Sequence, residues 1–197
     1  MYSSPAVNNG VVYVGSQDAR VYALDAATGA LLWRYITGDS VYSSASVAKG
    51  VVYIGSQDGN VYALKASTGS LLWKYSTAGL VIDSSPSVAN GVIYIGSYDS
   101  NVYALNAATG ALIWKYATGD VVDSSPAVAN GVVYVGGGDS NVYALDARSG
   151  GLIWKFATNS NVFSSPAVAN GVVYVGSNDG NLYAFGLPAG AAPTPSK

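Results

Sequence analysis

Residues 51–64 read VVYIGSQDGNVYAL, two apolar runs joined by the turn-forming segment 56–59. The runs are rich in Val, Ile and Tyr, which favour strands, and Asp-Gly between apolar runs is a strong β-hairpin signal. Residues 44–48 before the hairpin and residues 71–75 after it form two more short apolar runs, bounded by turn-forming residues. The stretch therefore predicts four short strands and no helix.

The same pattern recurs along the chain with a period of 40 or 41 residues. The motif Ser-Ser-Pro, or Ser-Ser-Ala once, begins at Ser3, Ser43, Ser84, Ser124 and Ser164. A fixed period of this length is typical of solenoids, propellers and arrays. The second apolar run of each unit is apolar at nearly every position, which indicates burial on both faces of the sheet. We therefore predict an all-β fold, a β-propeller of four-stranded antiparallel blades built from five repeats.

The repeats predict one propeller domain over residues 1–185. We place the units at about 3–42, 43–82, 84–123, 124–163 and 164–185, the last one incomplete. Residues 186–197 are rich in Pro and Ala and are expected to be a tail or linker, because Pro cannot donate to a strand ladder. The near-identity of the units and the start at a repeat boundary suggest amplification, excision from a longer protein or design.

The outer, fourth run of the unit occurs only four times, which leaves three ways to complete a ring. The chain could close as a five-bladed ring with one three-stranded blade. It could form part of a larger ring, or share blades with another chain. Of these we favour the closed monomeric ring.

The composition excludes much catalytic chemistry. The 197 residues are 50% hydrophobic and 10% charged, enough to bury a core, and they include no His and no Cys. All eleven acidic residues are Asp. A His-based triad, a thiolate nucleophile and a Cys/His zinc site are therefore excluded. The net charge of −2 argues against nucleic-acid binding, and no apolar run reaches the ~18 residues of a membrane span.

Residues 23–33, ALDAATGALLW, resemble the Ala-x-Asp-x-x-Thr-Gly-x-x-x-Trp signature of PQQ-like propeller repeats. That family includes quinoprotein alcohol dehydrogenases and an outer-membrane-assembly lipoprotein of Gram-negative bacteria. The resemblance covers residues 3 to about 185, including the hairpin 51–64. Lys65 and Asn106 depart from the signature at the position of Asp25, and the fifth unit ends without a Trp.

The resemblance implies a structural role for the Trp of each unit. Its indole is expected to dock against the neighbouring blade, helped by the Thr-Gly turn. The expected docking residues are Trp33, Trp73, Trp114, Trp154, Thr28, Gly29, Thr68, Gly69, Thr109, Gly110 and Gly150.

Nine of the eleven Asp residues are expected on one face of the propeller, here called the hairpin face. This face carries the central hairpins and the connections between units, while Asp25 and Asp146 fall on the opposite face. An Asp in a tight hairpin caps its own turn, which accounts for the pattern without a ligand. Alternatively, the summed charge attracts a cation or a basic segment, most densely around Asp120, Asp123 and Asp139. The candidate acidic binding residues are Asp18, Asp58, Asp99, Asp139, Asp179, Asp120 and Asp123.

Three functions remain after this reading. The first is a non-catalytic scaffold or protein-interaction module with no catalytic residues, cofactor or metal, because five similar units show no differentiated site. The second is a ligand- or cation-sensing propeller domain that uses the acidic face. The third and least favoured is a PQQ-dependent dehydrogenase. The expected partner is a protein or peptide, with a cation as the alternative, for a monomer or a blade-sharing oligomer. The resemblance alone suggests an extracytoplasmic location, in the periplasm or at the cell surface.

Overall fold

The computed structural model describes residues 3–77 and 82–186, which form strands and no helix. None of these residues belongs to a helix that could cross a membrane. The strands are β1 (Ala6–Asn8), β2 (Val11–Ser16), β3 (Arg20–Asp25), β4 (Leu31–Ile36), β5 (Ser46–Ala48), β6 (Val51–Gly55), β7 (Asn60–Lys65), β8 (Leu71–Ser76), β9 (Ser87–Ala89), β10 (Val92–Gly96), β11 (Asn101–Asn106), β12 (Leu112–Ala117), β13 (Ala127–Ala129), β14 (Val132–Gly136), β15 (Asn141–Asp146), β16 (Leu152–Ala157), β17 (Ala167–Ala169), β18 (Val172–Gly176) and β19 (Leu182–Gly186).

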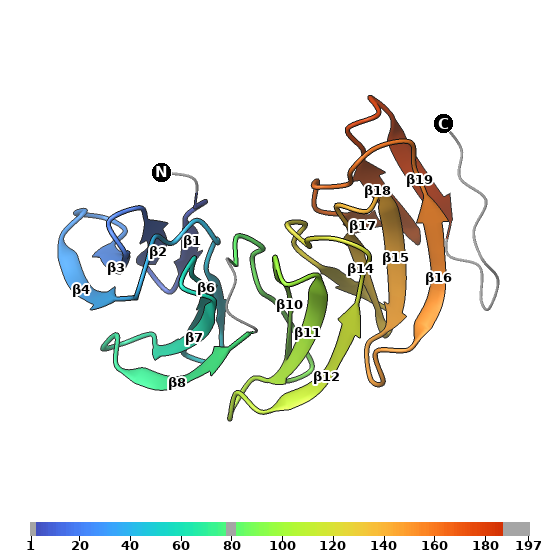
Figure 1. Cartoon of the computed structure of the whole chain (residues 1–197). Helices are drawn as coiled ribbons and strands as arrows, with labels where there is room; N and C mark the ends of the chain where they lie inside the picture. The colour runs from blue at the N-terminus through green and yellow to red at the C-terminus, as the bar shows by residue number, and fades with distance from the viewer. Residues whose placement is uncertain (1–2, 78–81, 187–197) are drawn as a thin grey trace.

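These strands form five antiparallel sheets in chain order, one for each sequence repeat. We call them blades 1 to 5, and Figure 1 shows them side by side from the N-terminus to the C-terminus. Blades 1 to 4 have four strands and the described part of blade 5 has three, β17 to β19. The all-β propeller-type fold and the five repeats are thus confirmed. The proposed tail, apart from Gly186, lies outside the described residues.

The hydrophobic core lies between blades, in the four seams that join consecutive sheets. In the first seam Tyr13 and Val21 of blade 1 pack with Val52, Ile54 and other residues of blade 2. The adjacent residue Tyr53 points the other way, into the seam with blade 3. Because successive side chains of a strand point to opposite faces, the second strand serves two seams. This explains why its sequence is apolar on both faces.

Serine side chains connect the inner strands of the blades. Ser43 Oγ accepts the Gly55 N–H at 3.1 Å within blade 2. The next residue, Ser44, donates its backbone N–H to Ser85 Oγ of blade 3 at 2.9 Å. The same between-blade bond joins Ser85 to Ser125 at 2.8 Å. The Ser-Ser motif therefore links each blade internally and to its neighbour.

The described residues 3–77 and 82–186 form an open ring (Figure 1), so the prediction that they close as a five-bladed ring was wrong. Blades 1 and 5 lie at opposite ends of an arc (Figure 1). Tyr174 of blade 5 is 38% exposed, whereas the equivalent tyrosines of blades 1 to 4 are 2–3% exposed. Leu182 is 63% exposed, whereas Val21 and its counterparts in blades 2 to 4 are fully buried. Whether a ring closes depends on the angle between consecutive blades. The side-chain packing in each seam sets this angle, and the sequence pattern does not specify it.

Candidate functional site

The hairpin aspartates hold their own turns. In blade 2, Asp58 Oδ1 accepts the backbone N–H of Asn60 at 3.0 Å. Its other oxygen, Oδ2, accepts the hydroxyl of Tyr62 at 2.5 Å. A carboxylate with both oxygens engaged by neutral donors retains its charge while losing free acceptor sites.

The same aspartates also reach the preceding blade. Asp58 Oδ2 accepts the N–H of Gly38, in the connection that leaves blade 1, at 2.7 Å. Asp139 accepts the Gly119 N–H at 2.9 Å, and Asp179 accepts the Asn159 N–H at 3.1 Å. Each of these carboxylates therefore joins two blades on the hairpin face.

The pKa values of these groups follow from their contacts. Burial raises the pKa of Asp58, but hydrogen bonds from Tyr62, Gly38 and Asn60 outweigh it and leave the pKa below its usual value. The balance is the same at Asp179, where it lowers the pKa to about 2. Burial and the adjacent carboxylate raise the pKa of Tyr62, which stays protonated as a donor. Asp58 and Asp179 are therefore charged at neutral pH.

Asp83 and Asp123 differ from the hairpin aspartates. Both lie in connections between blades, and burial raises the pKa of each above its ordinary value. The negative charge of Asp83 raises the pKa of Asp123 further. Asp83 accepts weak hydrogen bonds from Gln57 Nε2 and the Tyr98 hydroxyl, both at 3.3 Å. The charge of Asp83 thus acts on Asp123, an electrostatic coupling that the sequence analysis did not foresee.

The group predicted to be densest does not gather around a common point. Asp139 is engaged with Gly119 and Tyr143, and Asp120 caps the N–H of Val121 at 2.8 Å. Among the described residues, no three acidic side chains come together in a way that could hold a metal ion. At the free edge of blade 1, Asp18 pairs with Arg20 at 3.1 Å instead.

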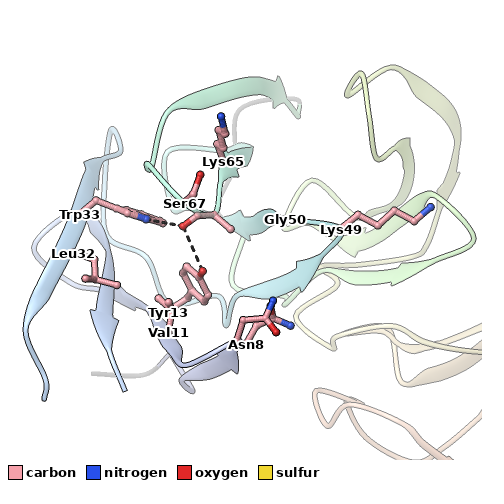
Figure 2. A pocket seen from close by; sticks show the side chains of 11 residues that line it. Asn8, Val11, Tyr13, Leu32, Trp33, Lys49, Gly50, Lys65 and Ser67 are labelled. Atoms are coloured by element: carbon pink, nitrogen blue, oxygen red, sulfur yellow. Dashed lines mark hydrogen bonds between the residues drawn. The ribbon is translucent and has the colours of Figure 1, made fainter. Parts of the chain in front are cut away.

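The predicted docking glycines Gly69, Gly110 and Gly150 lie in the seams between blades, whereas Thr28 and Gly29 are exposed in blade 1. Figure 2 shows the first seam, where the Trp33 indole Nε1–H donates to the carbonyl oxygen of Ala66 at 2.8 Å. The Tyr13 hydroxyl donates to the same oxygen at 3.4 Å, and the Tyr13 and Trp33 ring centroids are 5.8 Å apart. The indole covers Gly69 so closely that a Cβ there would lie 2.6 Å from it. Glycine is therefore required in this turn both for contact and for its φ of +71°.

The next two seams repeat this arrangement. Trp73 donates to the Ala107 carbonyl oxygen at 3.0 Å, and Trp114 donates to that of Ala147 at 3.0 Å. Their indoles cover Gly110 and Gly150 in the same way. Three of the predicted Trp residues are thus each brought onto a predicted Gly of the next blade, whereas none of the described residues covers Gly29 in this way.

Sequence reasoning did not identify a groove at the first seam. It has a volume of about 490 Å³ and is lined by Tyr13, Trp33, Lys49, Lys65 and neighbouring residues. Both lysines are departures from the repeat, since other units have Asn at the first position and mostly Asp or Asn at the second. These two departures from the repeat were the signal in the sequence that could have pointed to the groove. Figure 2 shows the two side chains extending away from the Trp33 ring, so their charges do not converge on the groove.

Comparison with known proteins identifies the family of the chain. The family model described as outer membrane protein assembly factor BamB matches residues 1–119 and 98–191. The chain belongs to the PQQ-like repeat family. No curated protein is significantly similar to it in sequence.

Solved structures share the fold of this PQQ-like chain. BamB from Moraxella catarrhalis superimposes with a TM-score of 0.84 at 22% identity, over 99% of this chain and 61% of that chain. The computationally designed Ika8 protein superimposes with a TM-score of 0.82 at 18% identity, over 91% of this chain and 56% of that protein. A quinohemoprotein alcohol dehydrogenase from Pseudomonas putida HK5 superimposes with a TM-score of 0.79 at 22% identity, over 98% of this chain and 41% of that enzyme. The chain therefore spans about three-fifths or less of each of these proteins.

Proposed function

We propose that this PQQ-like chain is a non-catalytic scaffold that binds proteins or peptides. The observation that carries the proposal is the use of its polar side chains. The hairpin aspartates and the Ser-Ser motifs bond to other blades or to their own turns, and the indoles of Trp33, Trp73 and Trp114 bond to the next blade in the same way. A catalytic centre needs differentiated groups in one place. The family model's description as an assembly factor supports the same function.

Quinone chemistry is a poor match to these residues. The chain has no Glu and no Cys, and its described residues contain no acidic cluster that could hold a metal ion beside a quinone. The likeness to a quinohemoprotein dehydrogenase is at 22% identity and concerns the fold. We therefore derive no reaction step through PQQ.

The test of the scaffold function is selection of binding peptides from a random display library on the immobilised chain. We expect enriched peptides that compete with one another for a common surface. The matched measurement is titration with PQQ and Ca²⁺, followed by absorbance. Saturable PQQ binding together with dye-linked alcohol oxidation would contradict the proposal.

A second candidate function is cation or basic-segment binding at the hairpin face. The half-buried residues Asp83 and Asp123 favour it, because burial and then the charge of Asp83 raise the pKa of Asp123, and a nearby cation would offset both effects. Calorimetric titration with Ca²⁺ and with a Lys-rich peptide tests this function. Binding that is lost in Asp123→Asn and kept in Asp25→Asn, on the opposite face, would support it. Unchanged binding in Asp123→Asn would exclude it.

A further inference from the structure

Blade 1 carries an unoccupied copy of the site that receives tryptophan in the other blades. Gly29 has the same φ of +71° as Gly69, but a Cβ at Gly29 would have no atom within 4 Å. Gly29 is exposed, while Gly69, Gly110 and Gly150 are buried beneath an indole. The turn of blade 1 therefore has the form of a docking site, and no ring of residues 3–77 or 82–186 lies above it.

The occupied copies define the ligand of this site. In each, the Trp is followed two residues later by a second aromatic ring that packs on the next blade. The Tyr35 ring lies 5.7 Å from that of Tyr62, and the Tyr75 ring lies 5.8 Å from that of Tyr103. The ligand of the empty copy is accordingly an extended strand with the pattern Trp-x-Tyr or Trp-x-Phe.

The apolar surface beside Gly29 is exposed in a way that its counterparts are not. Val12, Tyr22 and Leu24 are partly exposed in blade 1. At the same positions of blade 2, Val52 and Leu64 are fully buried and Tyr62 is 4% exposed. The free face of blade 1 thus presents the receiving half of a seam, one that recurs four times inside the chain.

An intact second copy of the chain has no such strand to offer. Trp33, Trp73 and Trp114 each donate to the next blade, and Trp154 packs on Phe185 at 5.1 Å between ring centroids. All four Trp residues of the chain are therefore engaged in its own seams. A Trp strand that occupies the copy in blade 1 therefore comes from outside these residues, unless one of their own seams opens.

We propose that the free face of blade 1, centred on Gly29 and Ala26, binds a Trp-x-Tyr or Trp-x-Phe β-strand of another polypeptide. The indole of that strand covers Gly29 and donates its Nε1–H to the Ala26 carbonyl oxygen, as Trp33 does to Ala66. The second aromatic ring packs on Tyr22, as Tyr35 does on Tyr62. This inference rests on the proposed scaffold function and names its surface and partner class.

The experiment titrates the full chain with a two-stranded peptide of residues 101–117, which contains Trp114 and Tyr116. 5-Fluorotryptophan at the Trp of the peptide gives a ¹⁹F NMR signal that only the peptide carries. We expect the signal to shift and broaden saturably on addition of the chain. A peptide with Trp114→Ala, labelled elsewhere, should bind about tenfold or more weakly, as for a Trp anchor.

Two glycine variants of the chain locate the binding. Gly29→Ala places a Cβ where the indole would lie, and Gly10→Ala is the matched control. Gly10 has a φ of +75° with nothing within 4 Å, so both variants carry a similar backbone strain. Circular dichroism checks that both fold. Loss of binding in Gly29→Ala alone supports the proposal, while equal binding to both variants overturns it.

Sedimentation of the chain without peptide tests whether a second copy of the chain, rather than another polypeptide, occupies this face. A dimer that dissociates in Gly29→Ala would assign the face to a second copy and overturn the proposed partner class. If library peptides bind but the Trp-bearing peptide does not, this inference fails while the scaffold function stands. If no peptide of any kind binds, both fail.

Discussion

The indole Nε1–H of Trp33 donates to the carbonyl oxygen of Ala66, 2.8 Å away in the next blade. This bond crosses the seam where blades 1 and 2 share their core, and it recurs with Trp73 and Trp114. Because a repeat protein is stabilised by its units and by their interfaces, such bonds contribute to the interface part of the free energy of unfolding.

Truncation of a seam tryptophan should be strongly destabilising. Trp114 is 8% exposed, so Trp114→Ala removes buried apolar surface and a hydrogen bond and should lower the free energy of unfolding by about 3–5 kcal/mol. The control is Leu112→Ala in the same strand, where the side chain is 44% exposed and the loss should be below about 1 kcal/mol. Urea unfolding followed by circular dichroism measures both. Equal losses would show that the indole does not hold the seam.

The glycine beneath each indole should be intolerant of a Cβ. A Cβ at Gly110 would lie 2.7 Å from the Trp73 ring, whereas Gly91, at φ +78°, has nothing within 4 Å. Both Ala variants carry the backbone strain of positive φ, about 1 kcal/mol. Gly110→Ala should add about 1–3 kcal/mol for overpacking. Thermal unfolding of the two variants compares them, and equal melting temperatures would contradict the tight contact.

Much of this architecture could be predicted from the sequence, because it depends on local pattern. The hairpin 51–64 predicted β6 and β7 to within a residue or two, since strand propensity and an Asp-Gly turn act within one unit. The contact of Trp33 with Gly69 was expected through a family resemblance. The electrostatic coupling of Asp83 with Asp123 and the opening of the arc were not predictable. Both depend on angles between blades, which are set by side-chain packing across seams.

The hairpin aspartates should give the chain an acid-sensitive stability. The folded pKa of Asp58 lies below its usual value. The contribution of Asp58 to the free energy of unfolding is therefore complete above the unfolded pKa of about 4. It is lost as the pH falls through the folded pKa. Asp58→Asn should therefore be destabilising at pH 7 and less so near pH 2–3. Urea midpoints measured across this range test the sign, and a difference that grows as the pH falls would contradict it.

Asp123 should show the opposite behaviour. Burial first, and then the charge of Asp83, raise its folded pKa above the unfolded value. The favourable contribution of the protonated form is therefore complete below pH about 4 and lost as the pH rises through the folded pKa. Asp123→Asn should be more stable than the parent chain at pH 7, and this advantage should vanish in acid. Asp25→Asn is the control, because Asn106 accepts the same two backbone N–H groups at the equivalent turn.

Lys65 leaves its turn without the cap that the equivalent residues supply. Asp25 Oδ1 accepts the Thr28 N–H at 2.8 Å, and Asp146 Oδ1 accepts the Ser149 N–H at 2.7 Å. A lysine side chain has no acceptor, and the Thr68 N–H donates instead to the backbone carbonyl oxygen of Lys65 at a longer 3.2 Å. Lys65→Asp should therefore raise the free energy of unfolding by about 0.5–1.5 kcal/mol, the net value of a hydrogen bond. Lys65→Ala separates the cap from the loss of the ammonium group, because it removes the charge and adds no acceptor. If Lys65→Ala stabilises the chain as much as Lys65→Asp in urea unfolding, the gain comes from charge and the capping argument is wrong.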